Sequence, residues 1–145
     1  MFTRILIATD GSPLARRAAR RGLAMAVRMG AEVMAFTVVP DWHVFSLDPK
    51  TARESLQRFD KRNRRAAEAA LAQIGREAAA LGVRCRTKQA RSDQPWKEIL
   101  GAAKRWRADL VVVGSHGHGS MAGLILGSQA HKVLTHCKVP VMVCR

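Results

Sequence analysis

Hydrophobic and polar positions follow one another in blocks along the chain, and the blocks predict alternating strands and helices. Short apolar runs rich in β-branched residues are typical of buried strands, whereas apolar residues three or four positions apart are typical of helices packed on one side. The pattern predicts strands at 4–9, 32–39, 83–88, 108–113 and 139–144, and helices at 13–29, at 52–81, from Pro95 onward and at 126–136.

The first helix has clear boundary signals. Ser12 is a favourable N-cap residue, and Pro13 suits the first helical position, where its missing N–H costs nothing. Gly30 suits the left-handed conformation that ends many helices. We therefore expect this helix to span 13–29.

The order of elements, βαβαβαβ, then a loop, then αβ, predicts a parallel sheet with helices on both faces. The chain has 145 residues, which fits one ordinary domain, and it contains no internal repeat or linker. The expected fold is therefore an α/β fold, a single doubly wound domain over residues 1–145 with a five-stranded sheet.

The composition of the chain indicates the cellular compartment in which we expect this domain. The cysteines Cys85, Cys137 and Cys144 show no CxxC spacing, which favours free thiols in a reducing compartment. No apolar run approaches the roughly 20 residues of a membrane span, and the first residues do not resemble a secretory signal. We expect a cytoplasmic protein without a membrane segment.

The formal net charge is +14, which attracts anions such as nucleotides, nucleic acids or acidic surfaces. Basic residues crowd the first half of the long helix, against Glu54 and Asp60: Lys50, Arg53, Arg58, Lys61, Arg62, Arg64 and Arg65. Such a stripe can neutralise phosphates, but there is no nucleic-acid recognition motif and no array of aromatic residues for stacking. We expect nucleic-acid binding to be at most non-specific and salt-sensitive.

A glycine-rich stretch, 114–128, follows the fourth strand. Gly114 and Gly117 allow the backbone to turn sharply and approach a ligand closely. Gly127 and Ser128 lie where the last helix begins, and the free N–H groups of a helix N-terminus bind anions. Because ligands of doubly wound sheets bind outside the carboxyl ends of the strands, the stretch predicts a phosphate site after the end of the fourth strand.

Two other nucleotide motifs fit poorly. The P-loop pattern GxxxxGK[ST] is absent. Residues 117–122 match GxGxxA, but they come after the fourth strand, whereas the dinucleotide motif comes after the first. That motif also needs an acidic residue about 20 positions later to hold the ribose. No Asp or Glu comes after Asp109. We reject NAD binding on these grounds.

The spacing Gly114-x2-Gly117-x9-Gly127-Ser128 resembles the nucleotide motif of the universal stress protein family. The resemblance extends to the segments 5–12, 108–117 and 139–143 and so covers nearly the whole chain. It implies the strand order 3-2-1-4-5 and the binding of ATP, with any Mg²⁺ held mainly through the phosphates and water. It also implies a stress-response binding module that acts as a homodimer.

The family resemblance assigns roles to particular residues. Asp10 would accept a hydrogen bond from the ribose. The adenine would be lined by Ala8, Thr9 and Val38, while the ribose and phosphates would be surrounded by Gly114, Ser115, His116, Gly117, His118, Gly127, Ser128 and Gln129. Two departures are visible: His118 stands where relatives often carry Arg or Lys, and the segment 91–95 lacks the glycine usual before its proline.

The C-terminal run Val139–Cys144 should form an edge strand, because Pro140 is typical of edges and an apolar edge needs covering. The resemblance implies that two copies meet along this strand. Trp42 and Phe45, after the second strand, form either a flap over the adenine or a loop anchor.

Other classes of function have weaker support. A hydrolase needs a positioned base and usually a metal, and Asp10 is the only motif carboxylate, so we assign no catalytic residue and expect at most slow ATP hydrolysis. The spacings of His116, His118, His131 and His136 are not those of zinc ligands, so no protein metal site is expected. A dimeric scaffold of the same fold that binds no nucleotide, or a basic nucleic-acid-associated protein, remains an alternative.

Overall fold

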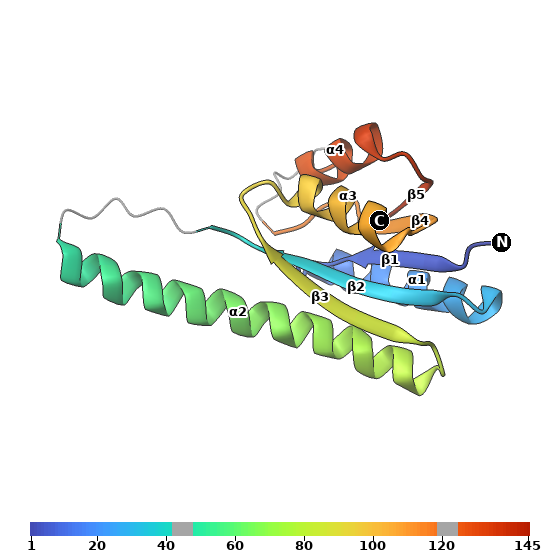
Figure 1. The fold of residues 1–145 in the computed structure, drawn as a ribbon, viewed down its shortest axis with the longest axis horizontal. Coiled ribbons are helices and arrows are strands. Elements are labelled where there is room, and N and C mark those ends of the chain that lie inside the picture. Colours follow the sequence, from blue (N-terminus) through green and yellow to red (C-terminus); the bar gives the residue numbers. More distant parts are fainter. Residues whose placement is uncertain (42–47, 119–124) are drawn as a thin grey trace.

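The computed structural model describes residues 1–41, 48–118 and 125–145, and it shows a parallel five-stranded sheet in the order β3-β2-β1-β4-β5 (Figure 1). The predicted α/β class and strand order are thus confirmed. The elements are β1 (Arg4–Ala8), α1 (Pro13–Met29), β2 (Glu32–Val39), α2 (Pro49–Ala80), β3 (Cys85–Arg91), α3 (Pro95–Trp106), β4 (Leu110–Gly114), α4 (Ser128–His136) and β5 (Val141–Cys144).

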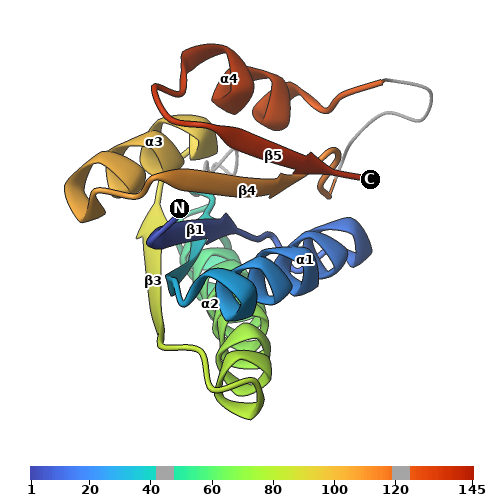
Figure 2. The same ribbon diagram turned by 90° about the vertical axis from the view of Figure 1, so that its right-hand side faces the viewer.

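Helices cover both faces of the sheet: α1 and α2 lie on one side, and α3 and α4 on the other (Figure 2). Successive strand residues point to opposite faces, so Ile7 packs toward α1 and α2 while Leu6 packs toward α3. The central strand β1 lies between β2 and β4, with Ile7 opposite Ala35 and Val112. From Ile5 to Ala8 both faces of β1 are buried, which explains the continuous apolar run that follows the exposed Arg4.

The ends of α1 match the sequence prediction. The hydroxyl of Ser12 accepts a hydrogen bond from the backbone N–H of Ala15 at 3.2 Å, and Gly30 ends the helix with φ 64°. In contrast, α2 begins at Pro49, before the predicted start at residue 52. The reason is that the carboxylate of Asp48 accepts hydrogen bonds from the backbone N–H groups of Lys50 and Thr51 and so caps the first turn.

Several strands are shorter or shifted relative to the pattern. β3 begins at Cys85 rather than 83, because the N–H of Val83 is still bonded to the carbonyl of Ala78 as the chain leaves α2. β4 begins at Leu110, because the N–H of Ala108 likewise bonds to Ala103 at the end of α3. The last two elements also start two residues later than predicted, at 128 and 141.

Asp109 joins the starts of β1 and β4. Its carboxylate accepts hydrogen bonds from the backbone N–H groups of Thr3 and Arg4 and from the Thr3 hydroxyl, at 2.8–2.9 Å. Partial burial opposes ionisation of Asp109, but these hydrogen bonds outweigh it and lower its pKa below the usual value. The carboxylate therefore stabilises the amino ends of β1 and β4. A ligand would bind at the opposite, carboxyl ends of the strands.

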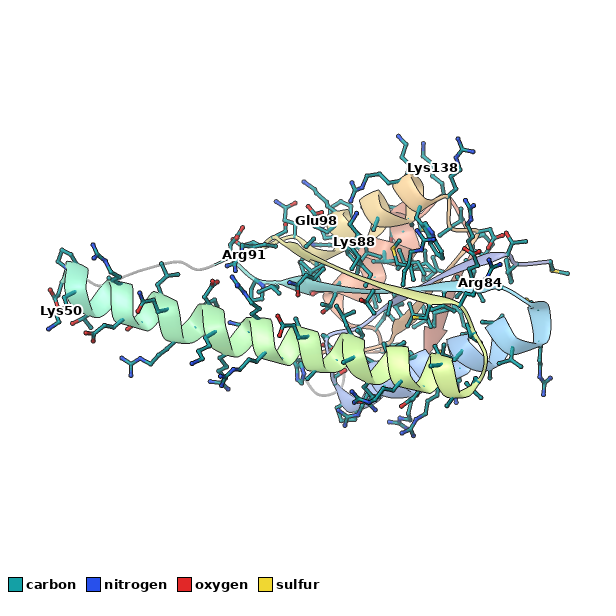
Figure 3. All side chains as sticks on the ribbon, turned by 60° about the horizontal axis from the view of Figure 1, so that its bottom comes forward. Lys50, Arg84, Lys88, Arg91, Glu98 and Lys138 are labelled. Carbon is teal, nitrogen blue, oxygen red and sulfur yellow. The ribbon has the colours of Figure 1, made fainter. Side chains whose placement is uncertain are left out.

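The long helix α2 extends well beyond the sheet (Figures 1 and 3). Its buried residues begin only at Ala67, so its first half projects away from the core, with Lys50 at the far end. Asp60 forms ion pairs with Arg91, at the end of β3, and with Arg64. None of the helices in the described part of the chain is long and apolar enough to cross a membrane.

Candidate functional site

The turn after β1 is held together by its own side chains. The Oγ1 atom of Thr9 accepts a hydrogen bond from the N–H of Gly11, whose φ of 78° requires glycine. The Oδ1 atom of Asp10 accepts another from the N–H of Ser12 at 2.9 Å. These hydrogen bonds orient the exposed Asp10 carboxylate toward the loop after β4.

Ser115 fixes the start of the glycine-rich stretch after β4. Its N–H donates to the carbonyl of Cys144 in β5, and its carbonyl accepts from the N–H of Gly127, each at 2.7 Å. Its side chain is 1% exposed, and its hydroxyl lies 3.1 Å from Nδ1 of His116. One buried residue thus connects β4, β5 and the beginning of α4.

The two strand ends meet at Asp10. The backbone N–H of His118 donates to Oδ2 of Asp10 at 2.6 Å, a short bond of the kind expected for a charged acceptor. A Cβ atom at Gly117 would overlap this same Oδ2 atom, so the close approach requires glycine. Gly114 is also confined, because a Cβ there would lie 3.2 Å from the backbone nitrogen of Ala15.

The N-terminus of α4 faces the same region. Gly127 is its N-cap residue, and no described side chain caps the helix. The first backbone N–H groups of a helix lack partners within it, and they carry the positive end of the helix dipole. The turn from Gly127 to Gln129 is therefore suited to an anion. Gln129 also ties α4 to α3, because its Oε1 atom accepts a hydrogen bond from the N–H of Trp96 at 3.1 Å.

These parts surround a cavity of about 670 Å³ at the carboxyl end of the sheet, between β1 and β4. The volume is in the range of small-molecule sites. Every residue that the sequence predicted for the nucleotide lines this cavity: Ala8, Thr9, Asp10, Val38, Gly114, Ser115, His116, Gly117, His118, Gly127, Ser128 and Gln129. Asp10 is the one carboxylate among the described lining residues.

Sequence reasoning missed the wall that α2 contributes. Asn63, Ala66 and Ala67 line the cavity from this helix. The Nδ2 group of Asn63 donates to the carbonyl of Phe59 at 2.9 Å, so the atom that Asn63 can offer a ligand as an acceptor is Oδ1. The only signal in the sequence is a small polar residue within a helix rich in alanine and arginine, and helical spacing alone does not place it at a strand end.

Pro95 and Ile99 of α3 and Val133 of α4 also line the cavity and were not predicted as site residues. Ile99 and Val133 belong to the apolar core, and they make the wall of the cavity continuous with it.

The expected flap residues Trp42 and Phe45 lie outside the described residues. Within 1–41, 48–118 and 125–145, no cluster of three or more His, Cys, Asp or Glu side chains is arranged to hold a metal ion.

The family assignment is supported by comparison with known proteins. The profile described as "Universal stress protein family" matches residues 1–145. This chain belongs to the universal stress protein family. A universal stress protein of Thermus aquaticus is 36% identical over 148 residues, covering all of both chains.

Solved structures of this family share the fold. A universal stress protein in complex with cAMP is 21% identical, with a TM-score of 0.73 over 99% of this chain and 97% of its own. A family member from Arabidopsis thaliana with AMP bound is 20% identical, with a TM-score of 0.66 over 97% of this chain and 90% of its own. At these identities the likeness establishes the fold alone.

Proposed function

We propose that this universal stress protein binds an adenine nucleotide in the cavity between β1 and β4, and that its function is that of a stress-response binding module. The single observation that carries the proposal is the convergence of Asp10, the glycine stretch and the N-terminus of α4 on one cavity. Two relatives of the same fold are bound to AMP and to cAMP, which supports the same class of ligand.

Each part of the cavity matches one part of a nucleotide. The Asp10 carboxylate is an acceptor for a ribose hydroxyl, because each of its oxygens can accept a further hydrogen bond beside the one from the N–H of Ser12 or His118. The N–H groups at the start of α4 and the hydroxyl of Ser128 suit phosphate oxygens. Hydrogen bonds to charged groups contribute roughly 1.5–3 kcal/mol each, so several together support micromolar binding of ATP.

The base would lie among Ala8, Val38 and the α2 wall. We propose that Oδ1 of Asn63 accepts a hydrogen bond from the 6-amino group of adenine. Guanine carries an oxygen at the same position, and two acceptors facing each other in a partly buried site are unfavourable. This contact would favour ATP, ADP and AMP over guanine nucleotides.

The test is to release bound nucleotide from the purified protein, identify it by chromatography, and titrate ATP, AMP and GTP by calorimetry. We expect adenine nucleotides in the extract and tighter binding of ATP and AMP than of GTP. No bound nucleotide together with no heat at millimolar ATP would overturn the proposal and favour a scaffold with an empty cavity.

We also propose that the protein is a homodimer through β5. This strand is an edge of the sheet, and its residues Val141, Met142 and Val143 remain partly exposed in the single chain. An apolar edge favours pairing with another strand. Light scattering during size-exclusion chromatography should give a mass twice that of the chain, and a monomer mass at micromolar concentration would contradict this interface.

A further inference from the structure

The outer surface of the α1/α2 layer carries arginines that have no ion-pair partner among the described residues. In both helices, exposed arginines occupy the positions opposite to the buried ones: Arg17, Arg21 and Arg28 in α1, and Arg58, Arg62, Arg65 and Arg76 in α2. We call these seven residues the arginine face. Figure 3 shows nitrogen-tipped side chains projecting from α1 and α2 on the side away from the sheet.

Carboxylates are positioned to pair with other arginines instead. Arg20, at the flank of α1, lies 3.8 Å from Glu77, and Arg84 lies 2.9 Å from Glu32. Asp60 pairs with Arg64 and Arg91. Within the part of the chain that the structure describes, no carboxylate lies within ion-pair distance of any member of the arginine face.

This arrangement works against the stability of the isolated helices. Arg17 and Arg21, like Arg58 and Arg62, are like charges four residues apart, a spacing that destabilises a helix by a few tenths of a kcal/mol per pair. The sequence of α1 contains no acidic residue at all. Glu54, one turn before Arg58, and Glu68, three residues after Arg65, are exposed carboxylates of α2, but neither lies within ion-pair distance of the arginine face in the described structure. The seven arginines outnumber these two carboxylates, and the resulting net positive surface favours a multivalent anion.

The residue types indicate which anion fits. Arginines outnumber lysines among the exposed cations of these two helices, with Lys61 beside Arg58, and the planar guanidinium group recognises phosphate oxygens in a bidentate manner. Three exposed residues on the outer side are small, Ala24, Ala69 and Ala72, while the longer side chains of Glu54 and Lys61 lie beside Arg58. A polyanion can approach the helices closely at the three alanines.

The positions of the aromatic residues indicate whether the arginine face suits single-stranded or double-stranded nucleic acid. Proteins that hold single strands stack the bases on aromatic side chains. The two tryptophans that the structure describes, Trp96 and Trp106, lie on α3, on the opposite side of the sheet, and Phe59, the one aromatic residue of α2, is partly buried. The arginine face therefore suits a duplex, in which the bases are stacked on each other and the phosphates are outside.

We propose that the arginine face binds the phosphodiester backbone of double-stranded nucleic acid without regard to sequence. This surface is separate from the nucleotide cavity, which is lined by Ala15 but by none of the seven arginines. The binding does not depend on the cavity being occupied.

The experiment measures binding of a fluorescent duplex DNA of random sequence by anisotropy, between about 50 and about 200 mM salt. The variant R17Q/R21Q/R65Q removes three charges of the arginine face from both helices, and glutamine preserves helix propensity. We expect the affinity to fall by at least about tenfold at low salt. The slope of log affinity against log salt should become shallower by about 0.9 for each phosphate that the variant no longer neutralises.

The matched control, K104Q/K132Q/K138Q, removes the same charge from exposed lysines outside the arginine face. It should bind the duplex nearly as the parent does. An equal loss of affinity in the control would overturn the proposal and indicate unspecific attraction by net charge. Tighter binding of the corresponding single strand, or equally tight and equally arginine-dependent binding of phosphatidylserine vesicles, would also overturn it.

Discussion

We propose that the cavity and the arginine face both bind anions, but by different physical means. In the cavity, the attraction comes from backbone N–H groups and the start of α4, which glycines and a single carboxylate hold in place. On the arginine face it comes from seven long side chains in water, with no partner that fixes them in the described structure. One site depends on geometry, and the other on the number of charges.

The difference has direct consequences for specificity. Backbone groups cost little entropy on binding because the fold has already ordered them, and a closed shape distinguishes one ligand from another. Exposed guanidinium groups lose rotamer freedom when they bind, and salt screens their attraction. The cavity should therefore be selective and salt-tolerant, and the arginine face tolerant of sequence but sensitive to salt.

The largest expected effect is that of Gly117→Ala on the cavity. The added methyl group would overlap Oδ2 of Asp10, so either the carboxylate or the loop must move away from the ribose. Losing one or two charged hydrogen bonds predicts a drop in ATP affinity of about 100-fold. Calorimetry checks the affinity, and the same variant should bind duplex DNA as the parent does. Equal damage to both activities would mean that the two regions are not independent.

The next largest expected effect is the change in the duplex and AMP affinities with salt concentration. Between about 50 and about 200 mM salt, duplex affinity should fall about 40-fold if roughly three phosphates are neutralised by the protein. The affinity for AMP should change by less than about threefold, because its contacts are mostly to oriented backbone groups. Parallel titrations of the two ligands measure both slopes. If both affinities fell with salt by a similar factor, the cavity and the arginine face would not bind anions by different physical means.

A smaller effect is expected from Asn63→Leu. This change removes the Oδ1 acceptor and keeps the side-chain volume similar, so discrimination between ATP and GTP should fall about tenfold while the fold is preserved. The ratio of the two affinities is the readout. If the ratio is unchanged while both affinities fall, Asn63 contributes shape to the cavity rather than selectivity.

The smallest effect is that of Gly75→Ala, which serves as a control for glycine substitution. Gly75 lies within α2, and a Cβ there would contact nothing within 4 Å. Alanine is the better helix former, so thermal unfolding should show a gain of up to about 1 kcal/mol. Binding of ATP and of duplex DNA should stay unchanged. A loss of ATP binding here would show that the cavity depends on α2 as a whole.

Much of the fold was predictable because local patterns and packing agree. The bounds of α1 and β2 match the prediction, since a capping serine, a proline and a left-handed glycine mark the former and a continuous apolar run marks the latter. The starts of β3 and β4 were predicted less well. There the backbone of Val83 and Ala108 is still bonded to the preceding helix, and hydrophobicity cannot reveal this.

The sequence by itself determined the fold class, because glycines, caps and apolar runs act over a few neighbouring positions. Through a spaced glycine motif it also indicated the family, whose resemblance named the residues expected at the cavity. Only the tertiary structure decided that Asn63 reaches this cavity from α2, that the loop after β4 donates to Asp10, and that seven arginines from two helices share one outer face. These features join residues that are distant in the chain. They depend on how helices are placed against the sheet, which no local pattern specifies.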